Sequence, residues 1–241
     1  MLLNFIESLS GGDVKTAFIT LLLSVPVILL ALTVHECAHG YVAYLCGDST
    51  AKAFGRLTLN PAKHLDPIGA LCMMLVGFGW AKPVPVNMRN LRKPKRDMVL
   101  VSLAGPVSNL LLAFISAAGL ELIAAFNRDG FYIYDSKLDL LMFFACQMLL
   151  MMVMLNIGLA LFNLIPLPPL DGSKILAGLL PNHLAMRYLQ IERYTGHIFL
   201  AVMLLSFTGV LDVLLMPLDW ARGTVLNAFL GLFEFLFRGI G

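Results

Sequence analysis

Residues 16–47 read TAFITLLLSVPVILLALTVHECAHGYVAYLCG. The 19 residues between Lys15 and His35 carry no charge. A helix needs about 20 predominantly apolar residues to cross a bilayer, so this stretch predicts a membrane-spanning helix. A helix from Thr16 to Cys46 would be about 45 Å long and would extend beyond the hydrocarbon core. Pro26 lies inside this helix and should kink it.

The composition of the whole chain agrees with a membrane protein. Of its 241 residues, 59% are hydrophobic and only 13% are charged. An ordinary soluble domain carries about 25% charged residues, so the composition excludes a soluble globular protein. It also excludes a disordered chain and a fibrous one.

Further apolar stretches predict more membrane segments. Three have the length of a span, at residues 98–125, 140–165 and 196–216. Residues 224–237 are short and contain Glu234, which leaves open a fifth span or an interfacial helix. Residues 67–80 have the length of a re-entrant segment. We therefore predict an all-α polytopic membrane protein with about four to five transmembrane helices, formed by residues 1–241 as one membrane-embedded domain.

The distribution of basic residues predicts the orientation. Residues 48–97 hold nine of the 17 Lys and Arg residues. Because cytoplasmic loops are enriched in Lys and Arg, this loop should be cytoplasmic and the N-terminus should lie outside. We expect a multi-pass protein of the cell membrane, and we read the basic loop as an orientation signal rather than a nucleic-acid site.

A metal-binding motif ends the first predicted span. His35, Glu36 and His39 form the pattern HExxH. On a helix, positions i and i+4 lie on one face, so both imidazoles can bind one zinc ion. Glu36 can then act as a general base toward a water molecule. Ionisable groups are rare and costly inside membrane helices, which favours a functional role over a packed polar cluster.

Catalytic zinc usually has three protein ligands, so one ligand must come from elsewhere in the chain. The candidates are His64, Asp66, Asp171, His183 and His197. Asp171 is best placed, because it follows a proline-rich break at the end of the third apolar stretch. Non-helical backbone at membrane depth is tolerated where it is buried in protein or lines a watery cavity. An ordinary aspartate at a helix terminus is the alternative.

Four motifs together resemble the site-2 protease family of intramembrane zinc metalloproteases. They are HECAH (35–39), NPAKHLDPIG (60–69), AGPVSN (104–109) and NLIPLPPLDG (163–172). The resemblance covers residues 30–176 and is that of a minimal, core-only member without PDZ or CBS domains, followed by C-terminal helices at residues 196–238.

The resemblance implies the remaining site assignments. Asp171 would be the third ligand of one zinc ion per chain, and Glu36 would activate water. Asn163 would orient the substrate or hold the oxyanion, with a helix-packing amide as its alternative. His64 would act in the site, or else hold its own loop by a structural hydrogen bond. Asn109 would pack or hydrogen-bond between helices.

The resemblance also implies the substrates. They would be transmembrane segments of other proteins in the lipid bilayer, which must unwind before cleavage. Residues 77–87 would form a short re-entrant β-hairpin whose edge offers replacement hydrogen bonds, or an irregular connector.

Two other functional classes use the same ligands. One is a membrane metal transporter or sensor, in which Glu36 would have no purpose. The other is an inactive relative that acts as a binding protein. Turnover that depends on Glu36 separates the endopeptidase from both.

Overall fold

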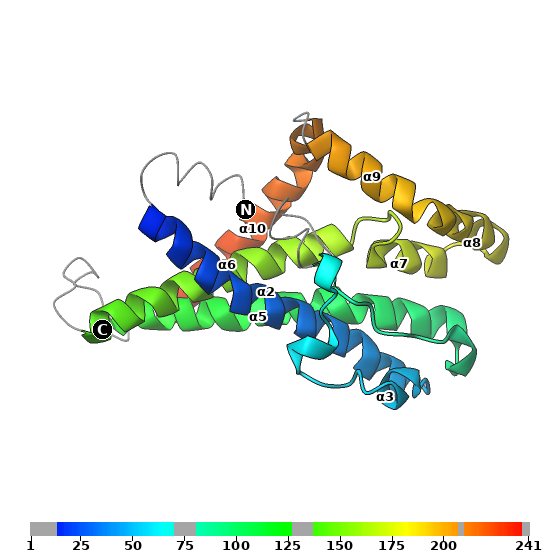
Figure 1. The fold of residues 1–241 in the computed structure, drawn as a ribbon, viewed down its shortest axis with the longest axis horizontal. Helices are drawn as coiled ribbons and strands as arrows, with labels where there is room; N and C mark the ends of the chain where they lie inside the picture. Colours follow the sequence, from blue (N-terminus) through cyan, green and yellow to red (C-terminus); the bar gives the residue numbers. More distant parts are fainter. Residues whose placement is uncertain (1–13, 70–80, 127–136, 207–209, 238–241) are drawn as a thin grey trace.

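A computed structural model describes residues 14–69, 81–126, 137–206 and 210–237. Three long helices form its central bundle: α2 (Val14–Leu45), α5 (Pro94–Phe126) and α6 (Lys137–Asn163). Figure 1 shows α5 and α6 running along the length of the molecule, with α2, in blue, crossing them obliquely. Within the described residues, three helical segments are long and apolar enough to cross a membrane: Phe18–Leu45, Pro94–Phe126 and Leu138–Asn163.

The bundle packs through small residues inside and presents large apolar residues outside. Ala113 and Ala117 of α5 are fully buried against Val153 and Ile157 of α6. Alanine allows two helix backbones to approach closely, as in many membrane bundles. On the outer faces, the exposed fractions of Leu22, Ile115 and Leu141 are 74%, 65% and 64%. Such surfaces suit contact with lipid rather than water.

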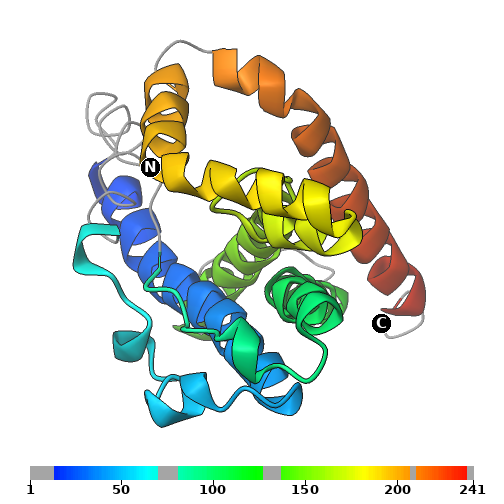
Figure 2. The same ribbon diagram turned by 90° about the vertical axis from the view of Figure 1, so that its right-hand side faces the viewer.

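Short elements connect the long helices. The α2–α5 connection contains α3 (Thr50–Ala53), η1 (Pro61–Lys63) and η2 (Met88–Asn90). After α6 the chain forms α7 (Asp171–Leu179), α8 (Asn182–Leu189), η3 (Gln190–Tyr194), α9 (Thr195–Ser206) and α10 (Val210–Phe237). Figure 2 shows α8 to α10, in yellow to red, arching along one side of the bundle. Phe233 of α10 is buried and packs beside Phe114 of α5.

The prediction of four to five transmembrane helices is wrong, because the described residues contain three candidate spans. The predicted fourth span, residues 196–216, is divided between α9 and α10. Helix α9 has 12 residues, which cover about 18 Å and fall short of a bilayer core of about 30 Å. Helix α10 is longer but carries Asp219, Arg222 and Glu234.

The prediction of a β-hairpin at residues 77–87 is also wrong. The described residues contain no strand, and residues 81–87 form an extended connector. Pro83 and Pro85 lack the N–H groups that a strand ladder requires. The intervening N–H of Val84 instead donates to the carboxylate of Glu36. Residues 77–80, and residues 70–80 of the predicted re-entrant segment, lie outside the described residues.

Candidate active site

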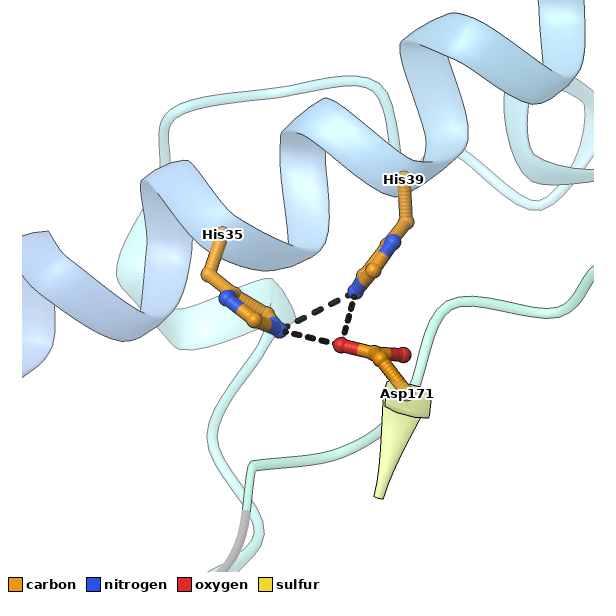
Figure 3. Close-up of side chains that lie close together, drawn as sticks. All are labelled: His35, His39 and Asp171. Atoms are coloured by element: carbon orange, nitrogen blue, oxygen red, sulfur yellow. Dashed lines mark hydrogen bonds and ion pairs between the residues drawn. The ribbon is translucent and has the colours of Figure 1, made fainter. Parts of the chain in front are cut away.

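Three side chains of the predicted metal set meet at the junction of α2 and α7. His35 and His39 lie one turn apart on α2, and Asp171 lies in the first turn of α7 (Figure 3). Asp171 Oδ2 is 3.2 Å from His35 Nε2 and 3.1 Å from His39 Nε2. The two Nε2 atoms are 3.0 Å apart. All three residues are buried. Within the described part of the chain, they form the only His, Cys, Asp and Glu cluster close enough to hold a metal ion.

Hydrogen bonds on the far side of each imidazole set its protonation. His39 Nδ1 lies 2.7 Å from the Val101 carbonyl oxygen, and His35 Nδ1 lies 2.5 Å from Asn109 Oδ1. Both partners are acceptors, so each Nδ1 carries a proton and donates it. Each Nε2 therefore presents a lone pair to the centre of the cluster, which is the form in which histidine binds metal.

The resulting donor set fits a zinc ion. Two imidazole lone pairs and a carboxylate oxygen converge, and none of them carries a proton to share with the others. Zinc bonds of about 2.0–2.1 Å in tetrahedral geometry separate neighbouring ligand atoms by about 3.3 Å. The observed separations of 3.0–3.2 Å are close to that spacing.

The charge of Asp171 suits the same role. Burial raises the pKa of its carboxyl, but contact with His35 and His39 in their protonated, charged form outweighs burial and holds the pKa well below its ordinary value; a bound cation in place of that proton would act in the same direction. Asp171 is therefore ionised at neutral pH, as a metal ligand must be.

Helix α5 forms the back wall of the site through Gly105. A Cβ atom at this position would lie 2.5 Å from His35 Cε1 and 2.5 Å from His39 Nε2. Any side chain here would displace the imidazoles, so the close approach of α5 to α2 requires glycine. This gives the AGPVSN segment a physical role beside the metal site.

A tight turn delivers Asp171 to the histidines. Helix α6 ends at Asn163, and the proline-rich stretch that follows leads directly into α7. A Cβ atom at Gly172 would collide with the carbonyl oxygens of Leu164 and Ile165. Glycine at this position lets the start of α7 fold back against the end of α6, which places Asp171 opposite α2.

Glu36 is held by the extended connector. Its Oε2 atom accepts a hydrogen bond of 2.9 Å from the Val84 N–H. The Val84 side chain is buried beside Gly40, one turn beyond Glu36 on α2. Residues 81–87 therefore lie along the face of α2 that carries the proposed base.

Asp48 anchors the other end of this connector. The residue is fully buried and accepts hydrogen bonds from Asn87 N at 2.7 Å and Asn90 Nδ2 at 2.9 Å. It also accepts from the backbone N–H and the hydroxyl of Thr50. Burial raises the pKa of Asp48, but the hydrogen bonds from Thr50, Asn87 and Asn90 outweigh burial and lower it. No motif in the sequence singled out Asp48.

A cavity of about 1960 Å³ opens beside the three-residue cluster. Its polar wall includes Glu36, Asn163 and the metal-binding cluster itself. Its apolar walls come from α2, α6, α9 and α10, and include Leu32, Leu155, Phe162, Val202, Leu205 and Leu215. A largely apolar chamber with polar groups at one side suits an apolar chain whose reactive bond must reach those groups.

The structure separates the other predicted residues from this cluster. Asn163 lines the cavity, and its Nδ2 donates to Leu159 O. His64 is buried, and its Nε2 donates to Thr58 O at 2.8 Å, as expected for the loop-holding alternative. Asp66 accepts from the N–H groups of Ile68 and Gly69 in a turn. His183 is exposed, and His197 packs edge-on against Tyr194.

Sequence reasoning missed Asn156 of α6. This residue is fully buried, and its Oδ1 accepts a 2.6 Å hydrogen bond from Asn109 Nδ2. A signal was present in the sequence, because an asparagine within the apolar run MMVMLNIGLAL is costly at membrane depth. The prediction that Asn109 hydrogen-bonds between helices is confirmed.

Comparison with known proteins agrees with this geometry. The model of "Peptidase family M50" matches residues 131–206, which include Asp171. The Bacillus subtilis protein named "Putative zinc metalloprotease YwhC" is 43% identical over 208 residues, or 86% of this chain and 90% of the relative.

A more distant relative carries a similar name. The Mycolicibacterium smegmatis protein "Putative zinc metalloprotease Rip2" is 30% identical over 186 residues, or 74% of this chain and 64% of the relative. No solved structure matches the chain significantly. With near-complete coverage of a relative at 43% identity, the chain belongs to peptidase family M50, the site-2 protease family of zinc metalloproteases, and zinc is its metal.

Proposed function

We propose that this protein is an intramembrane zinc endopeptidase that hydrolyses peptide bonds in or near transmembrane segments of other membrane proteins. The observation that carries the proposal is the convergence of three unprotonated donor atoms from His35, His39 and Asp171 at one side of a largely apolar cavity. Glu36 lies beside the first ligand and faces the same cavity.

The residues divide the chemistry between them. His35, His39 and Asp171 would hold one zinc ion, which lowers the pKa of water and polarises a carbonyl when bound. Glu36 takes a proton from the attacking water and later returns it to the leaving amine. Its contact with the Val84 N–H holds the carboxylate in place without supplying a positive charge, so it stays available as a base.

Asn163 is the proposed donor to the developing oxyanion. It lines the cavity at the end of α6, eight residues before Asp171. Its Nδ2 donates to Leu159 O, so the side chain must rotate away from its own helix to face a substrate carbonyl. His64 is already engaged with Thr58 O, and its proposed contribution is to hold the preceding loop.

We place this site toward the cytoplasmic side. The support is the excess of Lys and Arg in residues 48–97, which directly follow the helix that carries HExxH. Single cysteines at exposed positions such as Lys93, labelled in intact cells by a membrane-impermeant maleimide, test the orientation. Labelling only after the membrane is opened is the expected result.

The decisive test uses the full chain coexpressed with a panel of single-span reporter proteins tagged at both ends. The wild type should release tagged fragments, and Glu36→Gln should keep zinc and lose cleavage. Ser116→Ala, a buried substitution far along α5 from the site, should cleave normally. Cleavage retained by Glu36→Gln would contradict the proposed base. Zinc retained without cleavage of any reporter by the wild type would favour a metal sensor.

A further inference from the structure

A row of buried amides connects the metal site to α6. His35 Nδ1 contacts Asn109 Oδ1 at 2.5 Å, and Asn109 Nδ2 donates to Asn156 Oδ1 at 2.6 Å. Asn156 Nδ2 then donates to the Met152 carbonyl oxygen at 2.8 Å. Both asparagines are fully buried between α2, α5 and α6.

The orientation of the two amide groups is set at the Met152 end of the row. A backbone carbonyl can only accept, so Asn156 must turn its NH₂ group toward Met152 and its oxygen toward Asn109. Asn109 must then present its NH₂ group to Asn156 and its oxygen to His35. That oxygen requires a proton on His35 Nδ1, which leaves the lone pair on Nε2 facing the metal site.

We propose that Asn156 is a positioning residue that acts through Asn109 to hold His35 in its metal-binding tautomer. Without Asn156, the Asn109 amide keeps only a long 3.4 Å hydrogen bond from Nδ2 to the Ala31 carbonyl oxygen to hold its orientation, and we expect it to reverse and present its NH₂ group to His35. The reversed amide would favour the tautomer with the proton on Nε2, which cannot bind metal. The proposal rests on His35, His39 and Asp171 being the zinc ligands, and it adds a residue on α6 that touches none of them.

His39 offers an internal contrast. Its Nδ1 donates directly to the Val101 carbonyl oxygen, which cannot reverse. The two ligands are therefore held in the same tautomer by different means. His39 depends on one backbone atom, whereas His35 depends on two side chains whose orientation is correlated. Loss of Asn156 should affect the metal site through His35 alone.

Zinc affinity of the purified full-length protein, measured by competition with a chelator, tests the proposal without a protease substrate. Partners that orient metal ligands typically contribute 10–100-fold to affinity, so Asn156→Leu and Asn109→Leu should each weaken zinc binding by about that factor. Ser116→Ala is the matched control, because Ser116 is also buried in α5 but bonds only to Leu112 O. Its zinc affinity should equal that of the wild type.

The double variant distinguishes positioning from general structural damage. If Asn156 acts through Asn109, Asn109→Leu with Asn156→Leu should bind zinc no more weakly than Asn109→Leu alone. Loss of affinity that multiplies across the two variants would overturn the proposal. The visible absorption of the cobalt(II)-loaded protein should change in Asn156→Leu and not in Ser116→Ala, because it reports the geometry of the ligands.

Two further variants test the proposal even if Asn156→Leu does not fold. Asn156→Ser keeps a hydroxyl that can bond within its own helix but is too short to reach Asn109, so it should fold and still bind zinc weakly. Asn156→Asp has the shape of the amide and, protonated when buried, can make both hydrogen bonds, so it should restore affinity. Wild-type zinc affinity in both Asn156→Leu and Asn156→Ser would overturn the proposal that Asn156 positions His35 through Asn109. Zinc retained by Asp171→Ala would instead overturn the ligand set.

Discussion

The central bundle (α2, α5 and α6) and the C-terminal arch (α8 to α10) of this protein are packed very differently. Helix α5 alone contributes nine buried residues, among them Ser102, Gly105 and Asn109 beside the metal site. No described side chain of α8 or α9 is buried, and α10 contributes Phe233 at its far end. The arch nevertheless supplies much of the cavity wall. The bundle therefore holds the three-residue cluster in place, and the loosely packed arch lines the cavity beside it.

The largest expected effect comes from Asp171, the one proposed ligand outside α2. Asp171→Ala removes the carboxylate that joins the two imidazoles, so zinc should fall from about one per chain to a small fraction of that. Cleavage of any reporter should be lost with it. Mass spectrometry of the purified protein measures the metal, and helical content by circular dichroism checks the fold. Zinc unchanged in a folded variant would mean that another residue completes the site.

A pair of glycine substitutions compares the two regions directly. In the bundle, Gly105→Ala puts a methyl group 2.5 Å from both imidazoles, so zinc affinity should fall at least tenfold. In the arch, a methyl group added at Gly223 of α10 would meet no other atom within 4 Å. Gly223→Ala should leave zinc unchanged and stabilise its helix by up to about 1 kcal/mol.

Chelator competition and thermal unfolding of both variants measure these effects. Equal zinc affinities in Gly105→Ala and Gly223→Ala would remove the distinction between a tightly packed bundle and an open arch.

Filling the cavity from the arch should separate substrate binding from metal binding. Val202 of α9 lines the cavity, and Val202→Trp would occupy part of it. We expect cleavage of transmembrane reporters to fall about tenfold while zinc per chain stays constant. Leu204→Trp on the same helix is the control, because Leu204 is exposed and does not line the cavity. Equal cleavage by both variants would show that substrates do not use this space.

The last prediction concerns the connector between α2 and α5 and affects stability rather than the metal site. The pKa of Asp48 is lowered in the folded protein, so the ionised form stabilises the fold above the unfolded pKa of about 3.9. That contribution should disappear as the pH falls through the lower, folded pKa. Asp48→Asn should therefore lower stability by about 1–3 kcal/mol at pH 7 and by less at acidic pH.

Thermal unfolding of wild type and Asp48→Asn across pH 3–7 measures the difference. A difference in stability that is constant with pH would contradict an ionised anchor.

Local sequence patterns predicted the parts of the fold that depend on local properties. The apolar runs at the first three spans became α2, α5 and α6, since length and hydrophobicity decide whether a helix can cross a membrane. The same reasoning failed for residues 196–216, which the structure assigns to two helices, α9 ending at Ser206 and α10 beginning at Val210. It also failed for the connector, where alternating valines suggested a strand but the Val84 N–H bonds to Glu36.

The sequence by itself determined the position of the paired histidines, because the i, i+4 spacing of HExxH places both on one face of any helix. It also identified Asp171 as the best-placed third ligand, while leaving four other candidates open. Only the tertiary structure brought Asp171 within 3.2 Å of both imidazoles and put Gly105, Asn109 and Asn156 behind them. These contacts join residues far apart in the chain, and their hydrogen bonds depend on how three helices pack rather than on any local pattern.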